Sequence, residues 1–384
     1  MADSELFVVD ADSHVLEPPD LWETYLEDRY KARAIQIVPG PGGTEQLVAD
    51  GEVLLPMGLA GLGGVEREAM SVFEDPTLGY RDGAPLASMD TEARIRLLDD
   101  WGVDAGIVFP TIGILWDKPD DPELAMAWAR AYNRWQWDFA SPHLDRLVPI
   151  AQIPLYDVDL ALAELRRCLR LGFKGIFVAP EPVCGKRPSH PDFDPLWREL
   201  EDAGLPLCLH VIVRFTRPVG GFGQWFDGAA GERNWVFGFG LGGTFQLIPA
   251  ISALVCDGLF DRFPRLKALV VESGAGWVGY IMDRLDEKYE RFGSTSMKEK
   301  PSEYFRRNVW VVFDPDERSI DSQCDLLGEG HLLWGSDYPH IDSHLDAPDR
   351  IRARVAGLSA RRRRAVLGEN ARRLFRLDGG AGPR

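Results

Sequence analysis

Acidic and imidazole side chains crowd the end of the first apolar segment of the chain. In the run "FVVDADSHVLEPPDLW", the strand-like residues 6–9 are followed at once by Asp10, Asp12, His14 and Glu17. Carboxylates that lie close together repel one another unless a cation neutralises them. In an extended chain, residues two apart face the same side, so Asp12 and His14 can bind one ion. This spacing predicts a metal-binding segment, with Asp10 behind Asp12, where it can orient a ligand.

Three later segments place similar side chains at the ends of apolar runs. His210 ends "PLCLH", Glu272 follows "LVV", and "LLWGSDYPH" presents Asp337 and His340. Each has an ordinary structural interpretation, such as a core histidine or a turn cap. Their joint occurrence instead favours a metal site, because carboxylates and imidazoles suit Zn²⁺, Mn²⁺ or Fe²⁺. The predicted ligands are Asp12, His14, His210, Glu272 and Asp337.

Eight apolar, β-rich runs supply the elements that would position these residues. They are continuous rather than alternating, as is typical of parallel strands covered on both faces. The runs cover residues 6–9, 105–109, 147–153, 173–178, 207–213, 266–271, 308–313 and 331–335. Helical periodicity lies between several of them, for example from Leu124 to Phe139 and from Phe193 to Ala203, closed by Gly204. The alternation predicts an α/β protein, a (β/α)₈ TIM barrel, in which the carboxyl ends of the strands meet at one mouth.

Two long segments interrupt the alternation. Residues 18–88 are rich in Gly and Pro and are predicted to be an insertion over the barrel mouth. Residues 214–243 form a second insertion, interpreted equally well as a mobile lid or a subunit contact. It carries Arg214, Arg217 and Arg233, which are either surface charges or groups that hold a substrate anion. We therefore expect a single metal-dependent domain over residues 1–378 and a flexible tail at 379–384.

Composition excludes several function classes. Of the 384 residues, 43 are Lys or Arg and 60 are Asp or Glu, giving a net charge of −17, which disfavours nucleic-acid binding. The N-terminus lacks the pattern of a signal peptide, and no segment is predicted to approach the roughly 20 apolar residues of a membrane span. The five cysteines are dispersed without a CxxC pair, as is typical of a reducing compartment. These features predict a cytoplasmic protein that binds neither nucleic acid nor membrane.

Several motifs resemble those of the amidohydrolase superfamily. They are "DADSHVLEPPDLW", "AYNRW", "LGFKGIFV", "DPLWRELEDAGLPLCLH", "FPRLKALVVESGAGWV", "LLWGSDYPH" and "VLGENARRLF". The most similar branch is the amidohydrolase-related one typified by aminocarboxymuconate semialdehyde decarboxylase, and the resemblance covers nearly the whole chain outside the insertions. It implies a (β/α)₈ barrel with a divalent metal at the mouth, a small-molecule substrate and a homodimer.

The resemblance also assigns roles to residues. It implies metal binding by Asp12 and His14 of strand one, His210 of strand five and Asp337 of strand eight. Glu272 stands where decarboxylases of this family usually have a histidine, so it is either an acid/base group or a fifth ligand. We predict hydrolysis or non-oxidative decarboxylation of a small substrate bearing a carboxylate or carbonyl, with Glu272, Asp337 and His340 as catalytic residues.

Two other functions stay open at this point. The extra carboxylate, with Glu17, His340 or His344, can hold two iron ions, which would make the protein a dinuclear iron monooxygenase on the same barrel. A non-catalytic metal-binding protein that keeps the barrel for structural reasons is the other alternative. The sequence does not identify the substrate, the metal or the number of ions.

Overall fold

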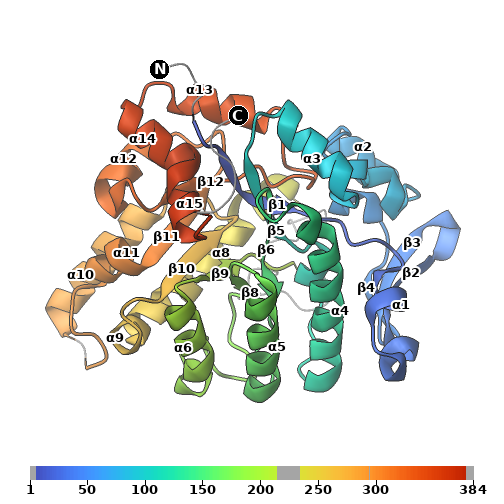
Figure 1. Ribbon diagram of the computed structural model, residues 1–384, viewed down its shortest axis with the longest axis horizontal. Helices are drawn as coiled ribbons and strands as arrows, with labels where there is room; N and C mark the ends of the chain where they lie inside the picture. The colour runs from blue at the N-terminus through green and yellow to red at the C-terminus, as the bar shows by residue number, and fades with distance from the viewer. Residues whose placement is uncertain (1–5, 214–233, 294, 378–384) are drawn as a thin grey trace.

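Parallel β-strands occupy the centre of the molecule. The computed structural model describes residues 6–213, 234–293 and 295–377 (Figure 1). The parallel strands are β1 (Val9–His14), β5 (Ala105–Phe109), β6 (Leu147–Pro149), β7 (Ala151–Gln152), β8 (Ile176–Val178), β9 (Pro206–His210), β10 (Lys267–Val271), β11 (Val309–Phe313) and β12 (Leu332–Trp334). Each of the eight predicted runs therefore contains a strand or directly adjoins one.

The strands pair in chain order. One sheet has the order β1-β5-β6 and the other runs from β7 to β12, and every pair within them is parallel. β6 and β7 are separated only by Ile150, so the third predicted strand is one run split in two. At the other end, Ser336 N and Asp337 N donate to Asp12 O at 3.1 and 2.8 Å, and His14 N donates to Tyr338 O at 2.6 Å. The chain that leaves β12 is thus hydrogen-bonded to β1.

Strand one differs from its prediction. The strand begins at Val9 rather than at Leu6, so Asp10, Asp12 and His14 lie inside it and are buried. Its pairing with β5 shifts register between Asp10 and Ser13, which marks a β-bulge. A bulge inserts an extra residue and re-aims the side chains around it. The regular alternation of side chains between the two faces is therefore interrupted between Asp10 and Ser13.

Helices surround the strands, and α4, α5 and α6 stand in a row along one flank in Figure 1. The α-helices are α1 (Leu21–Tyr25), α2 (Ala69–Glu74), α3 (Thr91–Asp100), α4 (Pro122–Ala140), α5 (Val158–Leu171), α6 (Asp194–Ala203), α8 (Trp235–Cys256), α9 (Leu259–Arg262), α10 (Val278–Phe292), α11 (Pro301–Asn308), α12 (Ile320–Gln323), α13 (Ala347–Val355), α14 (Ala360–Arg364) and α15 (Asn370–Leu374). Local sequence sets several boundaries. Asp121 caps α4 by accepting from Leu124 N, and Gly204 ends α6 in the left-handed conformation.

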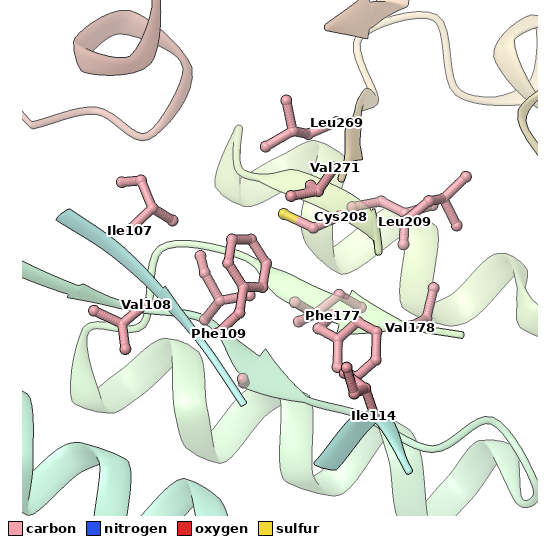
Figure 2. Close-up of a cluster of buried hydrophobic side chains, with 14 of the residues drawn as sticks. Ile107, Val108, Phe109, Ile114, Phe177, Val178, Cys208, Leu209, Leu269 and Val271 are labelled. Atoms are coloured by element: carbon pink, nitrogen blue, oxygen red, sulfur yellow. The ribbon is translucent and has the colours of Figure 1, made fainter. Parts of the chain in front are cut away.

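Apolar side chains from neighbouring strands fill the space between them. Figure 2 shows Phe109 of β5 and Phe177 of β8 near Cys208 and Val271 of β9 and β10. All four are buried. Burying a large apolar side chain contributes about 1.5–3 kcal/mol. This core holds the strand ends in fixed positions, which a multi-residue site requires.

The segment between β1 and α3 carries a small sheet of its own. Antiparallel strands β2 (Ile35–Pro39), β3 (Glu45–Ala49) and β4 (Glu52–Leu55) pair in order. Arg33 donates to both carboxylate oxygens of Asp50 at 2.5 and 2.6 Å, and to Asp121 at 2.7 Å. Since Asp121 also caps α4, these ion pairs tie the small sheet to the helical layer.

Helix α8 corrects one prediction. It has 22 residues, and its most apolar window reaches a mean hydropathy of 1.6, so by length and composition it is able to cross a bilayer. The prediction that no segment approaches this length was wrong. A core helix of a globular protein meets the same criteria, and 39% of that window is buried in the described structure. Residues 235–243 of the second predicted insertion form the first turns of this helix, whereas residues 214–233 lie outside the described part of the chain.

Candidate metal centre

The strand-one residues converge on a second imidazole. His14 Nε2 lies 3.3 Å from Asp12 Oδ1, and His210 Nε2 at the end of β9 lies 3.0 Å from His14 Nε2 and 3.6 Å from Asp12 Oδ1. All three residues are buried. Their donor atoms lie within 4.8 Å of one another, which is close enough for one ion. The sequence prediction that these three residues meet is thus matched by the geometry.

Backbone carbonyls set the tautomer of both imidazoles. His14 Nδ1 donates to Pro110 O at 2.8 Å, and His210 Nδ1 donates to Val211 O at 2.8 Å. Each neutral ring therefore directs an unprotonated Nε2 into the site, as metal-binding histidines do. Burial, reinforced by the nearby His340, lowers the pKa of His14 to about 3, so the neutral ring predominates.

Two further carboxylates complete the centre from β10 and β12. Glu272 Oε2 lies 3.3 Å from His210 Nε2, and Asp337 Oδ1 lies 3.4 Å from His14 Nε2. Both residues have left-handed backbones, with φ of 60° and 57°. Such conformations are uncommon outside glycine and occur at functional sites, where the surroundings hold them. Burial and the neighbouring carboxylates raise the pKa of both groups well above the usual range.

The donor set fits a divalent cation. Asp12 Oδ1 and Glu272 Oε2 are buried and accept no hydrogen bond from the described residues. The lone pairs of Asp12 Oδ1, His14 Nε2 and His210 Nε2 also face one another, an arrangement that is unfavourable without a cation. A second group of donors within 4.8 Å comprises His14, Glu272, Asp337 and His340. Because His14 belongs to both groups, the six residues form one continuous centre.

His340, a member of the second donor group, has a hydrogen-bond partner at each ring nitrogen. Its Nδ1 donates to Asp337 Oδ1 at 2.8 Å, and its Nε2 lies 3.0 Å from Thr111 Oγ1. A carboxylate only accepts, so the neutral ring carries its proton on Nδ1 and accepts from the threonine hydroxyl at Nε2. His340 therefore orients Asp337 and, through Thr111, connects the centre to the end of β5.

Asp10 and Glu17 have structural partners instead of a place in the centre. Asp10 accepts from Ser336 N at 2.9 Å and Ser336 Oγ at 2.5 Å, which fixes the turn before Asp337. Glu17 accepts from Ile112 N at 2.8 Å and Gly113 N at 3.1 Å. It thus binds the first amide groups of the short 3₁₀ helix η7 (Ile112–Ile114), and it belongs to neither group of clustered donors.

His344 is also not part of the centre. It is exposed and lies 3.7 Å from Asp316. Three residues near the centre were missed by sequence reasoning: Thr111 after β5, Asp314 after β11 and Asp342 in the turn after His340. Burial raises the pKa of Asp314 to about 7, with a further contribution from Glu317. Their positions just beyond strand ends were the available signal. Arg214, Arg217 and Arg233 lie outside the described residues.

A cavity of about 260 Å³ opens above the centre. Glu272, His340 and Thr111 lie on its polar side, and the remaining wall is largely apolar. Beneath the imidazoles, Phe109 and Phe177 pack against His210 with ring centroids 5.0 and 5.8 Å apart. The arrangement combines a buried cation site, a carboxyl group with a raised pKa and a cavity for an organic molecule, as in many active sites.

Comparison with known proteins places this centre in a family. The sequence profile of a family described as Amidohydrolase matches residues 83–377. The chain is 28% identical over 305 residues to gamma-resorcylate decarboxylase of Rhizobium sp. (strain MTP-10005), covering 75% of this chain and 88% of that enzyme. It is 25% identical to 2-amino-3-carboxymuconate-6-semialdehyde decarboxylase of Dictyostelium discoideum over 75% of this chain and 77% of that one.

Solved structures show the same fold. An amidohydrolase of Mycobacterium avium subsp. paratuberculosis K-10 superposes with a TM-score of 0.77 at 23% identity, covering 96% of this chain and 99% of that one. 5-Carboxyvanillate decarboxylase of Novosphingobium aromaticivorans, with bound manganese and 3-methoxy-4-hydroxy-5-nitrobenzoic acid, has a TM-score of 0.67 at 20% identity, covering 97% and 98%. The family match spans most of the chain and includes three of the strand ends that build the centre, so the chain belongs to this amidohydrolase family.

Proposed function

We propose that this protein is a divalent-metal-dependent decarboxylase that removes the carboxyl group of a small organic acid without oxidation. The observation that carries the proposal is the buried cluster of Asp12, His14 and His210. Asp337 adjoins this cluster at His14, and Glu272 adjoins it at His210. Decarboxylases among the relatives, and manganese in one structural neighbour, support this reaction over hydrolysis. Asp12, His14, His210 and Asp337 would hold the ion.

The residues of the chain have distinct tasks in this reaction. When bound, the ion would supply positive charge that offsets the negative charge of the substrate. The bond from the carboxylate carbon to its neighbour breaks, CO₂ leaves, and the electron pair stays on the neighbouring carbon. That carbon takes a proton, and Glu272 would donate it, because its carboxyl group lines the cavity beside the predicted ligands and burial raises its pKa. Glu272 then regains a proton from water.

The first test is turnover with manganese-loaded protein. Gamma-resorcylate and 5-carboxyvanillate are the trial substrates, and the reaction is run in D₂O with CO₂ release measured. We expect deuterium at the carbon that carried the carboxylate. Glu272→Gln should lower kcat by about 100-fold or more, because a general acid contributes roughly 10²–10⁴. Asp337→Asn tests whether the protein acts as an enzyme. If its cellular role persists after metal binding and turnover are lost, the proposal that it is an enzyme is contradicted.

A second candidate is oxygenation at two iron ions. It is favoured by one observation: the donors form two overlapping groups that share His14, with a carboxylate at position 272. Metal analysis of freshly purified protein separates the candidates. About one ion per chain with CO₂ release supports the decarboxylase, whereas two irons per chain with oxygen consumption support the monooxygenase.

We also propose a wider architecture. The hydrogen bonds between Asp12 and residues 336–337, together with the single-residue gap at Ile150, support closure of the two parallel sheets into one (β/α)₈ barrel. The domain would span residues 1–378, with the segments 18–88 and 214–243 as insertions. We also propose a homodimer, as the family resemblance implies. A cytoplasmic location is supported by the free state of all five cysteines, Cys168, Cys184, Cys208, Cys256 and Cys324.

A further inference from the structure

The cavity beside the metal centre has two chemically different sides. Thr111, Glu272 and His340 form the polar side, where the reacting end of a substrate would lie. The side away from the centre is built largely by the segment that precedes α3. Leu55, Met57, Leu62 and Val72 line it. This segment belongs to none of the parallel strands, so the outer wall is built separately from the strand ends that carry the centre.

The outer wall continues to the opening as an apolar rim. Phe239 of α8 and Met57 line the cavity and are each 50% exposed. Large apolar side chains that gather around an opening mark a ligand-binding groove more often than isolated surface positions do. The wall and its rim are therefore suited to an apolar part of a ligand that extends from the centre toward solvent.

The cavity is larger than a single aromatic ring requires. A dry apolar cavity of about 150 Å³ holds a benzene molecule. The cavity here measures about 260 Å³, so it can take a single aromatic ring at the centre and a short chain against the outer wall. Each methylene group of a ligand that is buried in such a wall increases the binding affinity about fourfold.

The described lining residues offer no cation to a second anionic group. Asp342 and Glu272 line the cavity, and the described lining residues include no Lys or Arg. A carboxylate carried at the far end of a substrate would lose water against apolar side chains without a cationic partner among the described lining residues, which is unfavourable.

We infer that the substrate carries an uncharged apolar substituent opposite its reacting carboxylate, and that Met57, Leu62, Val72 and Phe239 select it. This inference rests on the proposed function for the orientation of the ligand. It deepens that function by naming the substrate class. The substrates would be small acids with a single ring, like those named for the relatives, that carry an alkyl or similar group at the position opposite the carboxylate.

Binding of molecules that cannot react tests the inference separately from turnover. Loss of CO₂ from gamma-resorcylate gives resorcinol, whose carbon 5 points away from the reacting carbon. Resorcinol, 5-propylresorcinol and 3,5-dihydroxybenzoate are titrated into the manganese-loaded full chain by calorimetry. We expect 5-propylresorcinol to bind on the order of 50-fold more tightly than resorcinol, following the value per methylene, and 3,5-dihydroxybenzoate to bind more weakly than resorcinol.

Two exposed methionines provide a matched pair of variants. Met57→Glu places a charge in the outer wall and should remove most of the preference for the propyl group. Met70 of α2 is 49% exposed and does not line the cavity, so Met70→Glu should keep the wild-type preference. Both variants are checked by thermal melting, since a surface glutamate at either position should be tolerated.

The outcomes separate the two proposals. Equal binding of resorcinol and 5-propylresorcinol, tighter binding of 3,5-dihydroxybenzoate, or equal effects of the two glutamate variants would overturn the inference. A propyl preference that depends on Met57 supports it. If that preference is found but no trial acid loses CO₂, the decarboxylase proposal fails while the apolar wall stands.

Discussion

The Nε2 atoms of His14 and His210 lie 3.0 Å apart, although 196 residues separate them in the chain. Each ring donates its Nδ1 proton to a backbone carbonyl, so both rings present a lone pair to the same point. Asp12 Oδ1 faces that point as well. Since like lone pairs repel in a dry interior, a bound cation should stabilise the folded protein as well as serve the reaction.

Metal binding should therefore raise the melting temperature. At a Mn²⁺ concentration 100 times the dissociation constant, the folded state gains about 2.7 kcal/mol. Asp12→Asn removes the anionic oxygen at the centre and should abolish most of the rise, measured by differential scanning calorimetry with and without chelator. Asp192→Asn is the control, because Asp192 is a surface residue paired with Lys186. A full rise in Asp12→Asn would place the metal elsewhere.

The close approach of β12 to β1 depends on Gly335. A Cβ at this position would lie 2.2 Å from Asp12 Cβ, a distance at which one of the strands must move. Gly335→Ala should destabilise the protein by about 1–3 kcal/mol, as overpacking does, and weaken Mn²⁺ binding by about tenfold or more. Urea unfolding and calorimetric titration measure the two effects.

Gly330 supplies the comparison for that variant. It precedes the same strand, and a Cβ there would meet nothing within 4 Å. Gly330→Ala should leave the Mn²⁺ affinity unchanged. If Gly335→Ala also binds Mn²⁺ with wild-type affinity, the proximity of Gly335 to Asp12 does not position the ligand.

Helix α8 should control the position of Glu272. A Cβ at Gly243 would lie 2.2 Å from the carbonyl oxygen of Glu272, and Thr244 Oγ1 donates to Ser273 O at 3.2 Å. Gly243→Ala should displace the turn that carries Glu272 and lower kcat by about 10–100-fold, because a shift of about 1 Å in a reacting group has effects of this size. KM should change less, since the metal ligands on the other strands keep their places.

Gly240 lies one turn earlier in the same helix and provides the control. A Cβ there would meet nothing within 4 Å. Gly240→Ala should keep the wild-type kcat and stabilise the helix by up to about 1 kcal/mol. Equal losses of kcat in the two variants would indicate a general effect of α8 rather than contact with Glu272.

Glu17 should make stability depend on pH. Burial raises its pKa from 4.5 to about 7 in the folded protein, although Ile112 N and Gly113 N donate to it. The folded state then holds the proton more tightly than the unfolded state does. The resulting penalty is absent below about pH 4.5, grows as the pH rises through the interval, and is complete above about pH 7.

Glu17→Gln removes this titration. The free energy of unfolding of the variant minus that of the wild type should increase by on the order of 3 kcal/mol between pH 4.5 and 7, following about 1.4 kcal/mol per unit of pKa shift. Denaturant unfolding at a series of pH values measures the difference. A difference that stays constant across this interval would show that Glu17 keeps an ordinary pKa in the folded protein.

The order of the elements could be predicted from the sequence because it depends on local patterns. Continuous apolar runs identified the strands, and spacings of three and four identified α4 and α6. Placement of His210, Glu272 and Asp337 at strand ends followed directly, since parallel strands present their carboxyl ends on one side. We accordingly predicted from the strand ends that these side chains would lie close together.

Tertiary contacts decided the rest. The bulge in β1 separates Asp10 from Asp12, so two acids that a regular strand would place on one side have different partners. Glu17 turns to the backbone of η7, and Thr111 reaches His340 from β5. None of these contacts is local: each joins segments brought together only when the strands pair. A side chain's spacing along the chain determines which face it can occupy, whereas its partner across that face depends on the register, bulges and backbone turns of the folded protein.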